Sequence, residues 1–286
     1  MRRLKAQLDG IHASDTLRAR VRRIVKKRRY GAVSRRLGFT AAAAAVVCVA
    51  SLNFAPTVAA AAYEVPVLGA VARVVTLNRF AYQDGGYEVS VNVPKIEGLL
   101  SPELEAELNQ DFQDQADAVI AAFETDMREL KAEFGEETVH YGLRSDYEVK
   151  TDTQDILAID NYLYFTSGSS STVHSFYTID KRSGALLTLK GLFQEDADYV
   201  DVLSSYIRQE MERRNREEDG MFWVGQDEVE NFERISEDQN FYLNSDNQLV
   251  VCFDKYEVAA GAQGSPEFVI PSDVISGIAA FDLLKE

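Results

Sequence analysis

Residues 101–135 of this 286-residue chain, SPELEAELNQDFQDQADAVIAAFETDMRELKAEFG, have the clearest structural pattern in the sequence. Ser101 is a good N-cap, Pro102 suits the first turn of a helix, and Gly135 favours the end of that helix. Between these limits, apolar side chains recur at steps of three and four: Leu104, Leu108, Phe112, Ala116, Ile120, Phe123, Met127, Leu130 and Phe134. One long helix is therefore predicted, with an apolar face toward a core and an acidic outer face.

Short segments around this helix have the patterns of strands. Val89, Val91 and Val93 alternate with polar residues ahead of it, as in a half-buried strand. Further strands are expected at Tyr141–Val149, Ile156–Phe165, Phe176–Ile179, Leu186–Leu189, Phe241–Leu243, Leu249–Phe253 and Phe268–Ile270. Two shorter helices are expected, from about Asp196 to Arg216 and from Ser272 onward. Ahead of the strands, Pro66–Val75 has the spacing of a short amphipathic helix. This alternation predicts an α+β ectodomain of antiparallel strands with one long and two shorter helices.

Charge divides the chain into two unlike parts. Residues 1–36 contain 13 Lys and Arg and two acids, a net charge of +11. Residues 37–286 contain 17 bases and 44 acids, a net charge of −27. Such an asymmetry indicates that the two parts face different surroundings.

An apolar segment separates these parts. Residues 37–63 form a run of 27 without a charged side chain, and about 20 apolar residues suffice to cross a bilayer. Arg28, Arg29, Arg35 and Arg36 precede the run, whereas no base follows it before Arg73. The positive-inside rule therefore predicts a single-pass cell-membrane protein with a cytoplasmic N-terminus and an extracellular C-terminal region.

The same segment has the features of a secretory signal. Ala59 and Ala61 offer small side chains at positions −3 and −1 for cleavage before Ala62. An anchor and a cleavable site are both compatible with this sequence. The predicted division is thus a cytoplasmic segment 1–36, a transmembrane or signal-like segment 37–62, and an outer region 63–286, with subdomains of about 63–190 and 191–286.

The basic tail has one narrow apolar stripe. Leu17, Val21 and Ile24 recur at helical spacing among arginines and lysines, and so short a helix cannot bury a core alone. The stripe could lie on the anionic inner leaflet, or bind a partner protein with a hydrophobic groove and an acidic rim. Binding to nucleic acid is possible on charge alone, but the tail lacks interleaved aromatic residues.

No catalytic, cofactor or metal site is predicted. Ser169, Ser170 and Ser171 precede His174, but the simpler interpretation is a serine-rich tip before a strand with a histidine that reaches solvent. The acidic pairs Glu136–Glu137 and Asp196–Asp198 are interpreted as solvated rather than as a carboxylate dyad for glycan cleavage. Cys48 and Cys252 are interpreted as isolated small apolar residues.

The remaining specific patterns lie at six places along the chain. They are 65–69 (VPVLG), 145–149 (SDYEV), 177–181 (YTIDK), 187–190 (LTLK), 253–259 (FDKYEVA) and 268–271 (FVIP). By their order and spacing, the chain resembles the anti-sigma-V factor family, membrane-bound inhibitors of an extracytoplasmic-function sigma factor that act as lysozyme receptors. Its outer region also resembles paired domains that occur in some peptidoglycan deacetylases, but without a deacetylase domain.

The resemblance implies a function for each part. The tail with Leu17, Val21 and Ile24 would hold the sigma factor inactive, and the acidic outer region would bind lysozyme, a cationic protein. Binding would expose the Ala59-x-Ala61 site to signal peptidase, and an intramembrane protease would then release the tail. The ligand-facing loops would be those with Ser169 and with Ala260, Gly261 and Ala262, where the family tends to have Pro-Gly-Tyr.

Two other functions are compatible with the sequence. One is an anchored cell-wall enzyme or enzyme accessory of the peptidoglycan-deacetylase type, which would need a catalytic cluster. The other is an adhesion or lipid-surface protein whose basic tail only fixes its topology.

Overall fold

The structure is a computed structural model, and it describes residues 72–134, 140–167, 169–225 and 231–284. In the first part of the chain, the elements are β1 (Arg73–Asp84), β2 (Tyr87–Glu97), α4 (Pro102–Phe134), β3 (Tyr141–Asp152), β4 (Ile156–Ser167), β5 (Ser169–Asp180) and β6 (Ala185–Leu186). The second part contains η2 (Lys190–Leu192), α5 (Tyr199–Glu217), β7 (Phe241–Leu243), β8 (Leu249–Cys252), η3 (Gly261–Gln263), β9 (Glu267–Val269), α6 (Ser272–Ile275) and η4 (Asp282–Leu284). The α+β class is confirmed.

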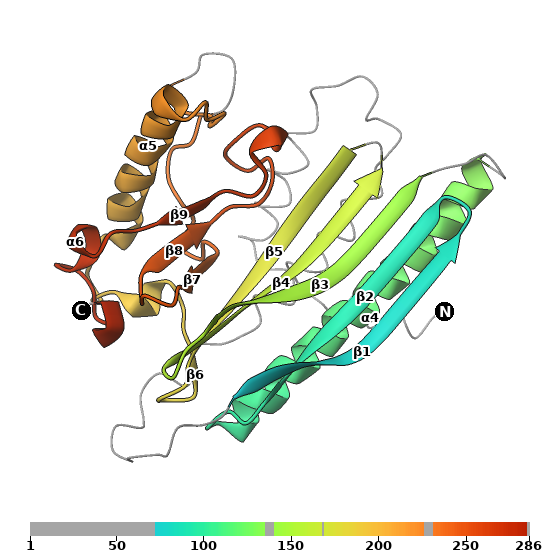
Figure 1. Cartoon of the computed structure of the whole chain (residues 1–286), viewed down its shortest axis with the longest axis horizontal. Helices are drawn as coiled ribbons and strands as arrows, with labels where there is room; N and C mark the ends of the chain where they lie inside the picture. The colour runs from blue at the N-terminus through green and yellow to red at the C-terminus, as the bar shows by residue number, and fades with distance from the viewer. Residues whose placement is uncertain (1–71, 135–139, 168, 226–230, 285–286) are drawn as a thin grey trace.

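The larger sheet has six strands in the order β1-β2-β3-β4-β5-β6 (Figure 1). All neighbours are antiparallel except β2 and β3, which are parallel, with Tyr87 opposite Tyr141. Parallel neighbours cannot be joined by a tight turn, and here the chain crosses between them through α4. The prediction of antiparallel strands was therefore wrong at this one pair.

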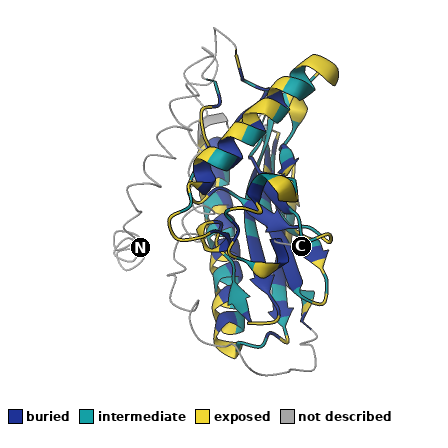
Figure 2. Cartoon of the chain, turned by 90° about the vertical axis from the view of Figure 1, so that its left-hand side faces the viewer, coloured by how far each residue is buried: buried dark blue, intermediate teal, exposed yellow. Residues whose placement is uncertain are grey.

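Helix α4 packs its apolar stripe on the sheet, as predicted. Leu108, Phe112 and Phe123 are at most 1% exposed, and they face the alternate buried residues of β2, such as Val89 and Val91. Figure 2 shows exposed residues along the outer sides of the helices and buried residues on the strands behind them. Each fully buried side chain of this size contributes about 1.5–3 kcal/mol to folding.

A polar network crosses the interface between α4 and the sheet. The Tyr177 hydroxyl donates to Asp111 Oδ2 at 2.9 Å, and Gln115 Nε2 donates to the Tyr177 hydroxyl at 2.7 Å. Asn161 Nδ2 donates to Gln115 Oε1 at 3.0 Å. Burial raises the pKa of Asp111 to about 6, although the hydrogen bonds from Tyr177 and Gln115 lower it. These bonds fix the helix against β4 and β5 in one register.

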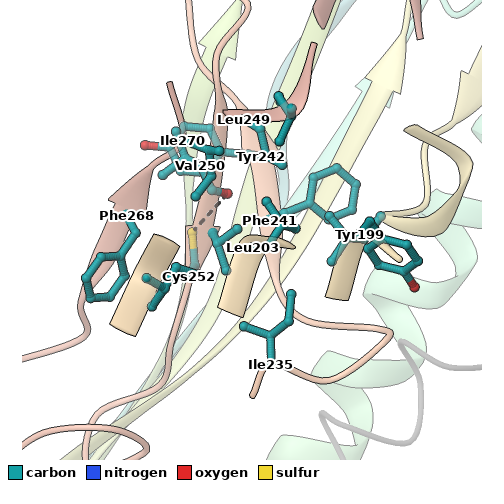
Figure 3. Close-up of a cluster of buried hydrophobic side chains, with 14 of the residues drawn as sticks. Tyr199, Leu203, Ile235, Phe241, Tyr242, Leu249, Val250, Cys252, Phe268 and Ile270 are labelled. Atoms are coloured by element: carbon teal, nitrogen blue, oxygen red, sulfur yellow. Dashed lines mark hydrogen bonds between the residues drawn. The ribbon is translucent and has the colours of Figure 1, made fainter. Parts of the chain in front are cut away.

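The smaller sheet, β7-β8-β9, is antiparallel and packs against α5. Leu203, Ile207 and Met211 of α5 are 0% exposed. Figure 3 shows Leu203 of α5 beside Phe241 and Cys252 of the sheet. Two residues of β4, Ile156 and Ala158, belong to the same core, so the two sheets share buried side chains.

Several predicted boundaries were wrong. Arg73–Val75 open β1 instead of ending a helix, because they pair with Lys95–Glu97 of β2. The strand expected at Phe176–Ile179 begins at Ser169, where β5 forms a hairpin with β4. The strand expected at Leu186–Leu189 has only its first residue in β6, and the helix from Ser272 has a single turn.

Other predictions concern residues outside the described ranges. They include the tail, the apolar segment 37–62, the Ala59–Ala62 site and most of the helix expected over Pro66–Val75. Among the helices that the structure does describe, none is long and apolar enough to cross a membrane. The subdomain boundary near residue 190 stays a prediction.

Candidate functional site

The two segments expected to face a ligand meet in the structure. One is the β4–β5 hairpin end with Ser169, and the other is residues 254–265, here named the β8–β9 loop because it joins those strands. Lys255 Nζ donates to Ser170 Oγ at 2.8 Å and so connects the two segments across 85 residues of sequence. Ser169 and Ala262 are exposed, whereas Ala260 and Gly261 are half-buried.

The tip of the β8–β9 loop is a short 3-10 turn, η3, that is fixed from both sides. The backbone N–H of Ala260 donates to the carbonyl oxygen of Met221 at 3.0 Å. In return, the N–H of Met221 donates to Gln263 Oε1 at 3.1 Å. Gly264 closes the turn with φ of 72°, a conformation that glycine adopts without strain. The tip is therefore preformed before any partner binds.

Tyr256 is an exposed aromatic residue in this loop, and the sequence pattern did not predict its exposure. Its φ is 68°, which is unusual for a bulky residue, and its side chain is 43% exposed. The ring lies so close to Gly261 that a Cβ there would be 2.2 Å from it. Met221, 49% exposed, lies beside the same turn. The loop thus presents an aromatic ring and a methionine, which are favoured contact residues at interfaces.

His174 on β5 lies where the larger sheet meets the β8–β9 loop. Its Nδ1 is 2.8 Å from Asp160 Oδ2, and its Nε2 is 3.0 Å from Ser265 Oγ. Its backbone N–H donates to Asp254 Oδ1 at 2.9 Å. Only 17% of its side chain is exposed, so the expectation that His174 reaches solvent was wrong. Strand β5 continues through this position, where His174 pairs with Tyr162 of β4.

Opposing effects set the ionisation of this pair. Burial lowers the pKa of His174, but the hydrogen bond and charge of Asp160, with Asp254 and Glu267, outweigh it and leave the pKa raised. Burial raises the pKa of Asp160, and the bond to His174 offsets only part of that shift. The neighbouring carboxylates thus favour the charged form of the His174 ring.

The order Ser265–His174–Asp160 has the contacts of a hydrolytic triad, but not its surroundings. A triad needs backbone N–H donors for the oxyanion. Pro266, which follows Ser265, has no N–H, and the N–H of Gly264 already donates to the carbonyl of Gly261 at 3.3 Å. Two of the donors nearest to Ser265 are thus not available, which favours a structural contact over a reaction centre.

The other candidate residues have structural roles where they are described. Asp198 Oδ1 accepts from the N–H of Asp201 at 3.2 Å and caps α5. Cys252 is buried in the core between α5 and the smaller sheet, and burial raises the pKa of its thiol. Across the described ranges, no three His, Cys, Asp or Glu side chains are grouped to hold a metal ion. Glu136, Glu137 and the tail stripe lie outside these ranges.

Comparison with known proteins identifies the family. The chain is 34% identical to the anti-sigma-V factor RsiV of Bacillus subtilis over 239 residues, which are 83% of this chain and 81% of that protein. The chain belongs to the anti-sigma-V factor family. This membership confirms the resemblance noted from the sequence motifs.

Family models match the two parts of this anti-sigma-V factor family member separately. Residues 82–169 match the family described as deacetylase PdaC, and residues 190–273 match a family of unknown function, DUF3298. The chain is also 25% identical over 209 residues to the peptidoglycan-N-acetylmuramic acid deacetylase PdaC of Bacillus subtilis, covering 39% of that enzyme. A solved DUF3298-family structure from Bacteroides fragilis has the same fold, with a TM-score of 0.57, 16% identity, and coverage of 76% of this chain and 98% of that one.

Proposed function

We propose that this chain is a membrane-anchored anti-sigma factor that holds an extracytoplasmic-function sigma factor inactive through residues 1–36. The observation that carries the proposal is the 34% identity with an anti-sigma-V factor across most of both chains. Within the tail, Leu17, Val21 and Ile24 would bind the apolar groove of the sigma factor, and the surrounding bases its acidic rim. Residues 37–62 would span the membrane with the N-terminus in the cytoplasm.

The outer region, in this proposal, is a receptor for lysozyme or another cationic protein. Its net charge of −27 would raise the rate of encounter with such a ligand. Charge alone gives little specificity, so the contact itself is assigned to Ser169 and the exposed tip of the β8–β9 loop. Ala260, Gly261 and Ala262 form that tip, with the Tyr256 ring beside them.

Ligand binding would lead to proteolysis. Signal peptidase would cut before Ala62, since Ala59 and Ala61 fit its small −3 and −1 pockets, and an intramembrane protease would cut next. The cut site lies 11 residues before Arg73, the first residue of β1.

Co-purification of the full chain with its cognate sigma factor tests the first step. Val21→Asp places a carboxylate in the apolar stripe, and burying that charge against an apolar groove is unfavourable. We therefore expect the sigma factor to be lost from the complex. Ala19→Asp makes the same change in charge off the stripe and serves as the matched control. Equal loss in both variants, or no sigma factor with the unaltered chain, would contradict the proposed role of the tail.

A second function, an anchored cell-wall enzyme or enzyme accessory, is supported by the match of residues 82–169 to the PdaC family. It requires a catalytic cluster, and the described residues around Ser265 do not complete one. Release of acetate from N-acetylated peptidoglycan by the purified full chain would favour this alternative.

A further inference from the structure

His174 contacts the second half of the chain at three separate points. Asn240 Nδ2 donates to the carbonyl oxygen of His174 at 2.9 Å, ahead of β7. Asp254 Oδ1 accepts the backbone N–H at 2.9 Å, and Ser265 Oγ lies 3.0 Å from Nε2. Asp254 and Ser265 are the first and last residues of the β8–β9 loop, so one residue of β5 fixes both ends of it.

The ring of His174 is itself held in place. Asp160, on the neighbouring strand β4, lies 2.8 Å from Nδ1 and is only 5% exposed. The ring stacks on Phe176 with centroids 5.9 Å apart, and the Tyr162 ring lies at a tilt with its centroid 6.1 Å away. Because the imidazole is oriented from β4 and β5, its Nε2 points at the loop from a rigid sheet.

We propose that His174 is the positioning residue of the β8–β9 loop, and that its charge determines how firmly the loop is held to the larger sheet. The inference rests on the proposed function only where it treats this loop as ligand-facing. The hydrogen bonds that attach the loop do not depend on which partner binds.

The charges around the ring explain the dependence on its protonation. Acids face it from three directions: Asp160 on β4, Asp254 at the start of the loop, and Glu267 on β9. Lys150 on β3 opposes them, but its ammonium is already bound to Glu267 Oε1 at 3.0 Å. The surroundings therefore stabilise the imidazolium, which donates from both ring nitrogens. The neutral ring retains both contacts only if the Ser265 hydroxyl rotates to donate to Nε2. The bond to Ser265 then joins two neutral groups, and the bond to Asp160 loses the positive charge of its donor.

The sign of the pH effect follows from these groups. The pKa of folded His174 is raised, so the extra hold is complete below the ordinary histidine value near 6.5 and is lost as the pH rises through the folded value. At the acidic end, protonation of Asp160, whose own pKa is raised, removes the partner charge. The loop is thus held most firmly at mildly acidic pH, between these two titrations.

Hydrogen exchange of the full-length protein in detergent tests the proposal. The quantity is the protection factor of loop amides between residues 255 and 264, corrected for intrinsic exchange and compared with the amides of β2 as an internal reference. For the unaltered protein, we expect loop protection to fall about tenfold as the pH rises from 6 through the titration of His174. For His174→Gln, we expect low loop protection with little dependence on pH, and unchanged protection of β2.

Two serine variants keep the test decisive if His174→Gln folds poorly. Ser265→Ala removes the partner of Nε2 from a half-buried loop position, and we expect loop protection to fall several-fold. Ser245→Ala, in the exposed turn between β7 and β8, makes the same change elsewhere and should have no effect. Loop protection in Ser265→Ala that equals the unaltered protein at every pH would overturn the proposal.

Two further readouts separate this inference from its alternatives. A serine-reactive fluorophosphonate should not label Ser265, and labelling there would overturn the positioning role in favour of a nucleophile. Lysozyme binding is measured on the same samples. If the unaltered protein does not bind lysozyme but its exchange follows His174 as described, the receptor function fails while the positioning role is supported.

Discussion

An aromatic residue introduced at the tip of the β8–β9 loop should strengthen binding of the proposed ligand. Ala262 occupies an exposed position in the 3-10 turn η3, at the place where the family resemblance implies a tyrosine. Both ends of the loop are bound to His174, and its tip is bound to Met221. Ala262→Tyr therefore adds a ring to a preformed surface without disturbing the core.

The size of the effect can be worked from the area of that ring. A tyrosine buries about 150–250 Å² when fully enclosed. At an exposed loop tip, about half of this area would be covered by a partner, which is worth about 2–3 kcal/mol at 25 cal/mol per Å². Ordering the side chain costs about 0.5–1.5 kcal/mol. The net gain of about 0.5–2.5 kcal/mol corresponds to roughly a 2- to 70-fold lower Kd for lysozyme.

Titration calorimetry of the full-length protein with lysozyme at physiological salt measures this gain. Ala106→Tyr is the matched control, since Ala106 is exposed on the outer side of α4. The account is contradicted if the two variants change Kd equally, because added aromatic surface would then act wherever it is placed. It is contradicted as well if Ala262→Tyr weakens binding while its melting temperature is unchanged.

Three other predictions concern stability and processing. Asp111→Asn should stabilise the fold by about 1–2 kcal/mol at pH 7.5. The pKa of Asp111 is raised to about 6, so the stabilisation that its protonation gives is lost as the pH rises from about 4. Thermal melts should show the difference between the two proteins vanish near pH 4. Leu108→Ala should lower the free energy of unfolding by about 2–5 kcal/mol in urea, since Leu108 is 0% exposed, whereas exposed Glu107→Ala should change it by less than about 0.5 kcal/mol. Ala61→Trp should leave full-length protein intact on immunoblots after lysozyme treatment, while Ala60→Trp, at the tolerant −2 position, should still be cut.

Helix α4 could be predicted to the residue because its signals are local. Ser101 and Pro102 begin it, the stripe through Leu108 and Phe112 sets its buried face, and each signal lies within the segment that it describes. Strand β1 could not be predicted in this way. Val74 and Val75 are compatible with a helix or a strand, and their pairing with β2 depends on residues about 20 positions away. Long-range pairing there outweighs local spacing.

The candidate site was predictable only in its parts. Residues 145–149, 177–181 and 253–259 carried the family resemblance, which the comparison with RsiV confirmed. The contact of Lys255 with Ser170, and of His174 with Ser265, joins segments more than 80 residues apart. No periodicity in the sequence encodes such contacts, and this explains why His174 was expected to reach solvent.

The conformation of Tyr256 was equally hidden. Its positive φ and its contact with Gly261 depend on how the loop closes between β8 and β9. A tyrosine in a polar stretch is normally assigned to the core or to no role. Its exposure beside the loop tip depends on the attachment of the loop to β5, which the local sequence does not encode.

Binding of lysozyme to the full-length protein, measured by calorimetry at low and at physiological salt, tests whether the outer region is a specific receptor. Screening at physiological salt removes most of the attraction between separated surface charges. A specific receptor should retain tight binding there, with loss of affinity when the loop tip is altered. Binding that physiological salt abolishes would show that the −27 charge of the outer region acts alone, and would contradict the proposed role of this chain as a lysozyme receptor.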